Sequence, residues 1–340
     1  MSVETFELAP GYLIPRIIRG GWQLAGDHGA VDRARAVDDM AAFVAAGVNT
    51  FDCADIYTGV EDLIGQYRQR DPSLQVHTKF VPDLEDLPRV DEAYVRRINE
   101  RSRQRLHTPA LDLVQFHWWD YEVPGMVRVA RLLAQLQREG GIRHLGGTNF
   151  DTPHTAQLLD AGVPLVSMQV QYSLLDRRPA GAMSALCAQS PLRLLCYGTL
   201  AGGFLTEKWL GAPDPQQIDN RSLIKYRLVI EDFGGWEAFQ KLLRLLKQIG
   251  DKHGVAIGAV ATRWVLDQPQ VAAAIVGARY AAHLPEQLQV FQVALDGEDL
   301  DAIEALLSQC RGPQGDSYAL ERDREGRHGR IMKYNLNKAT

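Results

Sequence analysis

Short apolar, β-branched segments alternate with longer helical segments from near the N-terminus to about residue 300. The strand candidates read as almost continuous apolar runs, which is typical of parallel strands that are buried on both faces. There are roughly eight of them, the number that closes a (β/α)₈ barrel. They are Ile14–Gly20, Val48–Cys53, Leu74–Phe80, Leu111–His117, Ile142–Thr148, Leu165–Gln171, Leu192–Tyr197 and Val271–Val276.

The segments between these strands carry helix start and stop signals. Asp151, Thr152 and Pro153 offer a cap followed by a proline in the first turn, and Gly162 follows the end of that helix. Residues 45–48 and 160–163 repeat one order of helix end, glycine and strand, which favours a repeated architecture. We therefore predict an α/β fold: a single (β/α)₈ TIM barrel over residues 1–310, the catalytic domain, and a C-terminal tail over residues 311–340.

Two stretches fall outside the repeated units. Residues 201–235 follow the seventh strand as a long loop rich in Gly, Pro and polar residues, and loops of this length are commonly lids or ligand clamps. The tail from Arg311 is also irregular, and two interpretations of it stay open. It is either a solvated extension or a segment that covers the active-site mouth or contacts another subunit.

Composition excludes several classes of protein. With 340 residues, of which 46% are hydrophobic, the chain buries a large core without a disulfide or metal staple. The net charge of -5 and the scattered basic residues argue against a nucleic-acid partner. No apolar run reaches the roughly 18 residues of a membrane span. The four cysteines are scattered and no apolar secretion signal is visible, so we expect a cytoplasmic protein.

Four polar side chains fall at or just after the ends of three successive strands: Asp52, Tyr57, Lys79 and His117. Barrel active sites lie at the carboxyl ends of the strands, so these side chains should share one patch. A tyrosine with an ordinary pKa of about 10 holds its proton too tightly for efficient acid–base catalysis. A nearby ammonium stabilises the phenolate and lowers that pKa, while a carboxylate keeps the ammonium charged. The set predicts a proton-delivery site, and therefore an enzyme.

The sequence lacks the motifs of two other kinds of enzyme. The nine histidines contain no His-x-His pair and no His-Glu-x-x-His run, so we expect no metal site. A Rossmann dehydrogenase would show a Gly-x-Gly-x-x-Gly turn after its first strand, and this chain shows none.

Several segments resemble those of the aldo-keto reductases, in order and in spacing, over residues 10–310. They are residues 47–57, 78–79, 117–118, 147–150 and 196–200. The resemblance implies an NAD(P)H-dependent oxidoreductase that reduces aldehyde or ketone carbonyls of small molecules, or catalyses the reverse. The family's catalytic tetrad falls on Asp52, Tyr57, Lys79 and His117. Tyr57 would be the general acid or base, while Lys79 and His117 would polarise the substrate oxygen.

The resemblance also implies a cofactor site. Thr148 and Asn149 match a pair that holds the nicotinamide carboxamide, Gln169 matches their partner, and Tyr197 matches an aromatic residue that stacks on the nicotinamide. Glycines there let backbone N–H groups approach the pyrophosphate. The positions that match the pyrophosphate loop are Gly198, Thr199, Leu200 and Gly202.

The adenosine end departs from the family pattern. Gly277, Arg279, Glu286 and Gln287 occupy the place of the motif that binds the adenosine 2′-phosphate, but Gly277 replaces a lysine. Arg279 still suits a phosphate, because its guanidinium can form two parallel hydrogen bonds. NADP(H) is favoured, and NAD(H) stays the alternative.

The substrate side is predicted from aromatic residues. Trp22 matches a position that lines the substrate pocket, and Trp118 would add a second wall, whereas Trp119 is predicted to pack in the core. Aromatic walls suit apolar carbonyl compounds and sugar faces alike. Two alternatives stay open: a nicotinamide-binding regulatory subunit of a partner protein, or an NAD-dependent sugar or alcohol dehydrogenase on the same barrel. The oligomeric state is also open.

Overall fold

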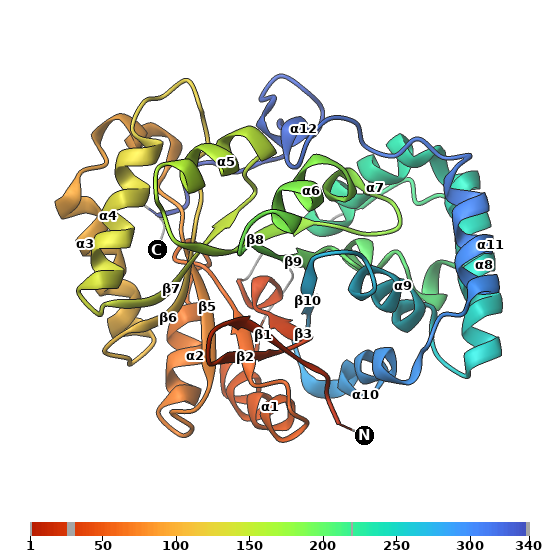
Figure 1. Ribbon diagram of the computed structural model, residues 1–340. Coiled ribbons are helices and arrows are strands. Elements are labelled where there is room, and N and C mark those ends of the chain that lie inside the picture. Colours follow the sequence, from red (N-terminus) through yellow and green to blue (C-terminus); the bar gives the residue numbers. More distant parts are fainter. Residues whose placement is uncertain (1, 26–30, 219, 338–340) are drawn as a thin grey trace.

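A closed barrel of eight parallel strands forms the centre of the molecule. The computed structural model describes residues 2–25, 31–218 and 220–337. Figure 1 looks along the barrel, with the helices arranged around it. The predicted (β/α)₈ architecture is confirmed. Around the barrel the strands are β3 (Ile17–Gly20), β4 (Thr50–Asp52), β5 (Gln75–Phe80), β6 (Leu111–Phe116), β7 (Ile142–Thr148), β8 (Leu165–Gln171), β9 (Arg193–Tyr197) and β10 (Val271–Gly277), which pairs with β3.

An antiparallel hairpin, β1 (Thr5–Ala9) and β2 (Tyr12–Pro15), precedes the barrel and lies across its near end in Figure 1. The prediction of one strand over 14–20 is therefore wrong: β2 ends at Pro15 and β3 begins at Ile17. Buried hairpin side chains, among them Leu8 and Ile14, pack against residues inside the barrel such as Leu113 and Leu195. The hairpin plugs the amino-terminal end of the barrel, so a ligand pocket can open only at the other end.

An outer ring of helices covers the strands, because each helix buries one apolar face. In α4 that face consists of Met126, Val129, Ala130 and Leu133, at the spacing of a helical stripe. The predicted cap of α5 is present, since the Asp151 carboxylate accepts a hydrogen bond from His154 N at 2.9 Å. The ring helices are α1 (Arg33–Ala45), α2 (Val60–Arg68), α3 (Glu92–Arg105), α4 (Met126–Arg138), α5 (Thr152–Asp160), α6 (Ala182–Ala188), α9 (Ile257–Leu266) and α10 (Leu284–Leu288).

Two further helices, α8 (Gly235–His253) and α11 (Gly297–Leu307), lie side by side outside α9 (Figure 1). Short 3₁₀ turns occupy several connections. They are η1 (Trp22–Leu24), η2 (Leu84–Arg89), η3 (Arg178–Ala180), η4 (Ala201–Gly203), η5 (Glu207–Trp209), η6 (Ala281–His283) and η7 (Gln289–Gln292).

The long loop predicted over 201–235 contains a thirteen-residue helix, α7 (Arg221–Phe233), so the prediction of an irregular loop is wrong for its second half. Asn220 caps this helix by accepting hydrogen bonds from Ser222 N and Leu223 N. Its buried face has helical spacing, a signal that was present in the sequence. That face consists of Tyr226, Val229, Ile230 and Phe233.

The described part of the C-terminal tail, residues 311–337, packs on the barrel and contains one short helix, α12 (Ala319–Arg322), at the top of Figure 1. Its Glu321 accepts two hydrogen bonds from Arg178, at 2.9 and 3.0 Å, and all but 1% of that glutamate side chain is buried. A merely solvated extension does not fit these contacts.

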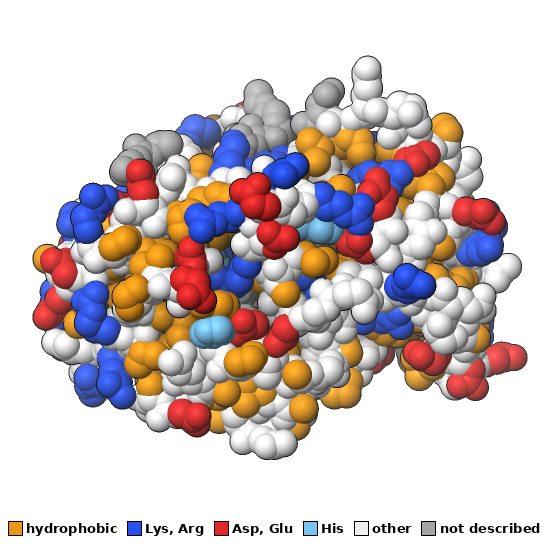
Figure 2. Space-filling model, turned by 90° about the horizontal axis from the view of Figure 1, so that it is seen from above, with side chains coloured by type: hydrophobic (Ala, Val, Ile, Leu, Met, Phe, Trp, Pro, Cys, Tyr) orange, Lys and Arg blue, Asp and Glu red, His pale blue; other side chains and the backbone are white. Residues whose placement is uncertain are grey.

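The surface shows no continuous basic area on the face seen in Figure 2, where acidic and basic side chains are interspersed. In the described part of the chain, no helix is long and apolar enough to span a membrane.

Candidate active site

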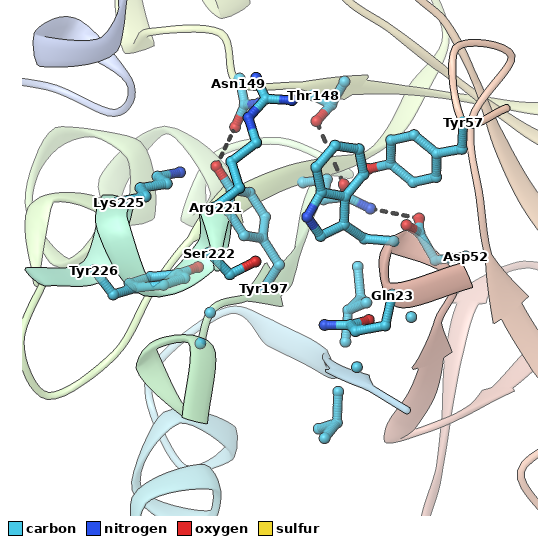
Figure 3. Close-up of a pocket in the computed structure, with 18 of the residues that line it drawn as sticks. Gln23, Asp52, Tyr57, Thr148, Asn149, Tyr197, Arg221, Ser222, Lys225 and Tyr226 are labelled. Carbon is cyan, nitrogen blue, oxygen red and sulfur yellow. Dashed lines mark hydrogen bonds between the residues drawn. The ribbon is translucent and has the colours of Figure 1, made fainter. Parts of the chain in front are cut away.

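A pocket of about 510 Å³ lies at the carboxyl ends of the strands, and the four predicted catalytic residues line it together. Asp52 ends β4, Tyr57 follows in the next connection, Lys79 lies in β5 and His117 directly follows β6. Figure 3 shows Asp52 and Tyr57 on the same side of the pocket. The joint placement inferred from the strand ends is therefore what the structure has.

The Asp52 carboxylate organises the buried end of the site. Its Oδ1 lies 2.7 Å from Lys79 Nζ, which also donates to Cys53 O at 2.8 Å. Its Oδ2 accepts hydrogen bonds from Gln115 Nε2 at 3.0 Å and Gln169 Nε2 at 2.7 Å. Burial disfavours the Lys79 ammonium, but the adjacent carboxylate outweighs this, and the pKa of Lys79 is raised. Gln115 was missed, although a glutamine within the apolar strand β6 is itself a signal of a buried partner.

Tyr57 stands between an indole and an ammonium. Its ring centre lies 4.9 Å from that of Trp22 and 5.3 Å from Lys79 Nζ. Burial raises the pKa of Tyr57, and the nearby Lys79 charge lowers it only in part, so the pKa is raised on balance. The expected net lowering is therefore wrong, because desolvation of the phenolate exceeds the attraction of Lys79.

The orientation of the His117 ring determines which of its nitrogens carries the proton. Its Nδ1 lies 2.8 Å from the carbonyl oxygen of Thr148, which can only accept, so Nδ1 carries the proton. Burial, and then the charge of Arg322, lowers the pKa of His117 to about 3, so the ring is neutral near pH 7. Nε2 is buried, lacks a hydrogen-bond partner among the described residues, and belongs to a pocket-lining side chain. It is a free acceptor.

The residues predicted to hold nicotinamide line the same pocket on the next strands. Gln169 connects them to Asp52, and its Oε1 accepts a hydrogen bond from Thr148 Oγ1 at 3.5 Å. Asn149 has a left-handed backbone, with φ of 60°, and its Oδ1 accepts from the Tyr197 hydroxyl at 2.9 Å (Figure 3). A backbone bond from Asn149 N to Gln169 O, 2.9 Å long, joins this pair to the Gln169 strand, so the strand ends hold these residues together.

The predicted pyrophosphate loop borders the pocket, with Gly198, Thr199, Leu200 and Gly202 among the lining residues. Gly198 has φ of 77°, and a Cβ there would lie 2.3 Å from the Tyr226 hydroxyl. Its backbone therefore requires glycine, and packing against α7 requires it as well. Helix α7 adds lining residues that the sequence analysis missed, because it treated the segment as loop. They are Arg221, Ser222, Lys225 and Tyr226 (Figure 3).

At the adenosine end, the structure separates the predicted residues. Gly277 and Arg279 line the pocket, but Glu286 and Gln287 do not; Gln287 Nε2 lies 3.4 Å from Gly277 O. A Cβ at Gly277 would lie 2.1 Å from Nε2 of Gln23, another lining residue that was missed. The Gln23 amide thus fills the space that a longer side chain at 277 would need.

The two consecutive tryptophans are placed the opposite way from the prediction. Trp118 is fully buried, does not line the pocket, and donates from Nε1 to Val123 O at 3.0 Å. Trp119 lines the pocket instead, 4.4 Å from the His117 ring. Neighbouring residues point to opposite sides of an extended segment, so only one of them can face the pocket. Trp22 lines the pocket as predicted.

The tail contributes part of the pocket wall. The tail residues that line the pocket were not predicted individually, since the local sequence of an irregular segment does not show what it packs against. They are Tyr318, Ile331, Met332, Lys333 and Leu336. Among the described residues, no group of three or more His, Cys, Asp or Glu side chains is arranged to hold a metal ion.

Comparison with known proteins agrees with this geometry. The Aldo/keto reductase family profile matches residues 16–308. The chain belongs to this family, and it is therefore an oxidoreductase of the class that acts on carbonyl groups.

Individual relatives are distant. The chain is 27% identical to Aldo-keto reductase YhdN of Bacillus subtilis, over 86% of this chain and 89% of that protein. It is 29% identical to Flagellar radial spoke protein 5 of Chlamydomonas reinhardtii over 63% of this chain, a match that spans about half of that protein (49%). A glycerol dehydrogenase structure from Gluconobacter oxydans superposes with a TM-score of 0.75 at 25% identity, covering 93% of this chain and 97% of the other.

Proposed function

We propose that this protein transfers a hydride between a nicotinamide cofactor and the carbonyl carbon of a small aldehyde or ketone, with Tyr57 as general acid or base. The observation that carries the proposal is the pocket shared by Asp52, Tyr57, Lys79 and His117 with Asn149 and the other predicted nicotinamide residues. When bound there, the cofactor supplies or accepts the hydride.

The charge of the pocket suits a dinucleotide. Asp52 is the one acidic side chain among the described lining residues, and Lys79 already pairs with it. Four more cations line the pocket, which suits a pyrophosphate. They are Arg221, Lys225, Arg279 and Lys333. In this proposal Thr148 and Asn149 hold the carboxamide, Tyr197 stacks on the nicotinamide, and Arg221 of α7 faces the pyrophosphate, while Lys225 stays beside Glu321.

Tyr57 would deliver the proton. Its pKa is raised by burial, so the phenol keeps its proton at neutral pH and can donate it to the oxygen of a carbonyl undergoing reduction. The Lys79 ammonium, held by Asp52, then stabilises the phenolate that remains. In alcohol oxidation the same phenolate takes the proton back.

His117 would orient the substrate rather than polarise it. A neutral ring whose Nδ1–H is used by Thr148 has only an acceptor at Nε2, and a carbonyl oxygen offers no proton to it. The hydroxyl of an alcohol does offer one. The role implied by the family resemblance, polarisation of the carbonyl, is therefore replaced in this proposal by an orienting contact to the alcohol.

The direct test is the consumption of NADPH or NADH by purified protein with a panel of aldehydes and ketones, and the reverse reaction with glycerol and other alcohols. We expect turnover with at least one carbonyl. Oxidation of polyols with NAD⁺, without reduction of any carbonyl in the panel, would instead favour the sugar or alcohol dehydrogenase. The similarity to a glycerol dehydrogenase supports that alternative.

A second candidate function is that of a nicotinamide-binding subunit of a larger assembly, and the similarity to a radial spoke protein favours it. That function predicts tight cofactor binding without turnover on any member of the panel. Cofactor titration by fluorescence, run beside the turnover assay, distinguishes the two.

Cofactor choice gives a separate prediction. Since Gly277 offers no cation, Arg279 is the guanidinium left at this end of the pocket to receive an adenosine 2′-phosphate. A hydrogen bond to a charged group contributes about 1.5–3 kcal/mol, so Arg279→Ala should weaken NADPH binding roughly tenfold or more. NADH binding should change little. Equal losses for both cofactors, measured by titration, would refute this role of Arg279.

A further inference from the structure

One side chain of the tail reaches the two connections that carry the proposed substrate-orienting and carboxamide-binding residues, His117 and Asn149. Arg322 ends α12, and its Nη1 donates to Trp118 O at 2.5 Å and Trp119 O at 2.6 Å. Its Nη2 donates to Asn149 O at 2.9 Å. A single guanidinium therefore bridges the segment that follows β6 and the segment that follows β7.

The guanidinium is partly buried and packs against an aromatic ring. It lies 3.8 Å from the ring centre of Tyr121, a stacking distance. The side chain is partly buried, its Nε is shielded from solvent, and burial lowers the pKa of Arg322. The planar fork of an arginine can serve carbonyls on two segments at once, whereas a lysine ammonium has a single nitrogen.

The two bridged segments are also joined directly. His117 precedes Trp118, and its Nδ1–H is bonded to the carbonyl of Thr148, which precedes Asn149. Arg322 therefore closes a second connection beside this hydrogen bond. It also fixes the carbonyl of Asn149, whose left-handed backbone is further held by its N–H bond to Gln169 O and by the bond between its side chain and Tyr197.

Glu321, the residue before Arg322, supports the neighbouring Tyr197 side of the pocket. Glu321 is bonded to Arg178 and lies 3.9 Å from Lys225, whose ammonium is 5.1 Å from the ring centre of Tyr197. Two consecutive tail residues thus support the surroundings of both Asn149 and Tyr197.

We propose that Arg322 is a positioning residue, which holds His117 and Asn149 at a fixed separation so that the substrate-orienting and carboxamide-binding groups face one bound nicotinamide. This rests on the proposed function. Arg322 itself touches neither ligand in this proposal, and acts through the backbone of the two segments.

The test compares Arg322→Met and Arg322→Lys with Arg324→Met in the full-length protein. Arg324 is the matched control, because it lies two residues further along the tail in a half-exposed pair with Asp120. Cofactor affinity is measured by titration with NADPH and NADH, and turnover with benzaldehyde at saturating cofactor.

We expect Arg322→Met to raise the cofactor Kd about tenfold and to lower kcat roughly ten- to hundredfold, with KM for benzaldehyde changed less, because misplaced groups slow the chemical step. Arg322→Lys should recover part of both losses. Arg324→Met should stay within about twofold of the unaltered protein, as is usual for exposed positions.

Equal behaviour of the Arg322 and Arg324 variants would overturn the proposal, as would a loss of thermal stability with unchanged Kd and kcat in the folded fraction. If Arg322→Met does not fold, the Kd and kcat of Arg322→Lys are compared with those of Arg324→Met in the same way. The cofactor titration needs no turnover. It therefore tests Arg322 even if the unaltered protein reduces no carbonyl, a result that would contradict the proposed function instead.

Discussion

Replacing Tyr57 by phenylalanine should reduce carbonyl turnover at least about a hundredfold, since general acid–base groups contribute about 10²–10⁴-fold. The change removes only the hydroxyl and keeps the ring that packs 4.9 Å from Trp22. Cofactor affinity should therefore stay within a few-fold. The measurement is kcat with a carbonyl found active in the panel, with cofactor Kd from a parallel titration.

Tyr226→Phe is the matched control, because it also removes one phenol hydroxyl from the pocket lining. Tyr226 belongs to α7, and its hydroxyl lies beside Gly198. Figure 3 shows Tyr226 on the opposite side of the pocket from Asp52, so its effect on kcat should be small. Near-normal turnover by Tyr57→Phe, or an equal loss in both variants, would refute the role of Tyr57 as the acid.

Arg178→Met should cause the largest loss of stability among single substitutions in the tail contacts. The Arg178 side chain is 3% exposed and pairs with Asp176 and Glu321, which are 0% and 1% exposed. Removing one partner of a buried ion pair leaves uncompensated charge and costs about 3–5 kcal/mol. The free energy of unfolding from urea titration measures this loss. Arg96→Met, at an exposed pair with Glu139, should change it little.

The same ion network gives a pH dependence with a defined sign. Burial alone would raise the pKa of Glu321, but Lys225 and Arg178 overcome it and lower the pKa from 4.5 to about 2. Because the folded pKa lies below the unfolded one, the stabilisation is present above about pH 4.5 and is lost as the pH falls toward about 2. Unfolding free energies should decline across this window, and less steeply in Arg178→Met. A parallel decline in the two proteins would contradict this assignment.

The barrel and its deepest polar residues could be predicted from local sequence. Parallel strands read as apolar runs, and a strand end fixes where its last side chains point, so Asp52, Tyr57, Lys79 and His117 could be placed together before any coordinates. The hairpin was missed because residues 14–20 look like a single apolar strand, although Pro15 and Arg16 interrupt the run. Helix α7 was missed because the glycines and prolines before residue 220 are typical of a loop, and the loop prediction was extended over the whole segment.

The rest of the site depends on contacts between segments distant in the chain. Arg322 lies more than 170 residues from Asn149, and Gln23 more than 250 from Gly277. No pattern within either segment shows such a pairing. The pKa of Tyr57 was misjudged for a similar reason, since the nearby charge is visible in the sequence but the extent of burial is not.

The shared use of the Asp52 carboxylate limits how such a protein can diversify. One oxygen serves Lys79 and the other accepts from Gln169, so a substitution that adjusts the proposed proton donor should also disturb the proposed nicotinamide site. The apolar residues with which the tail lines the pocket have no such double role; they are Ile331, Met332 and Leu336. New substrates should therefore be acquired by changes at these positions, while the buried centre is inherited as a unit.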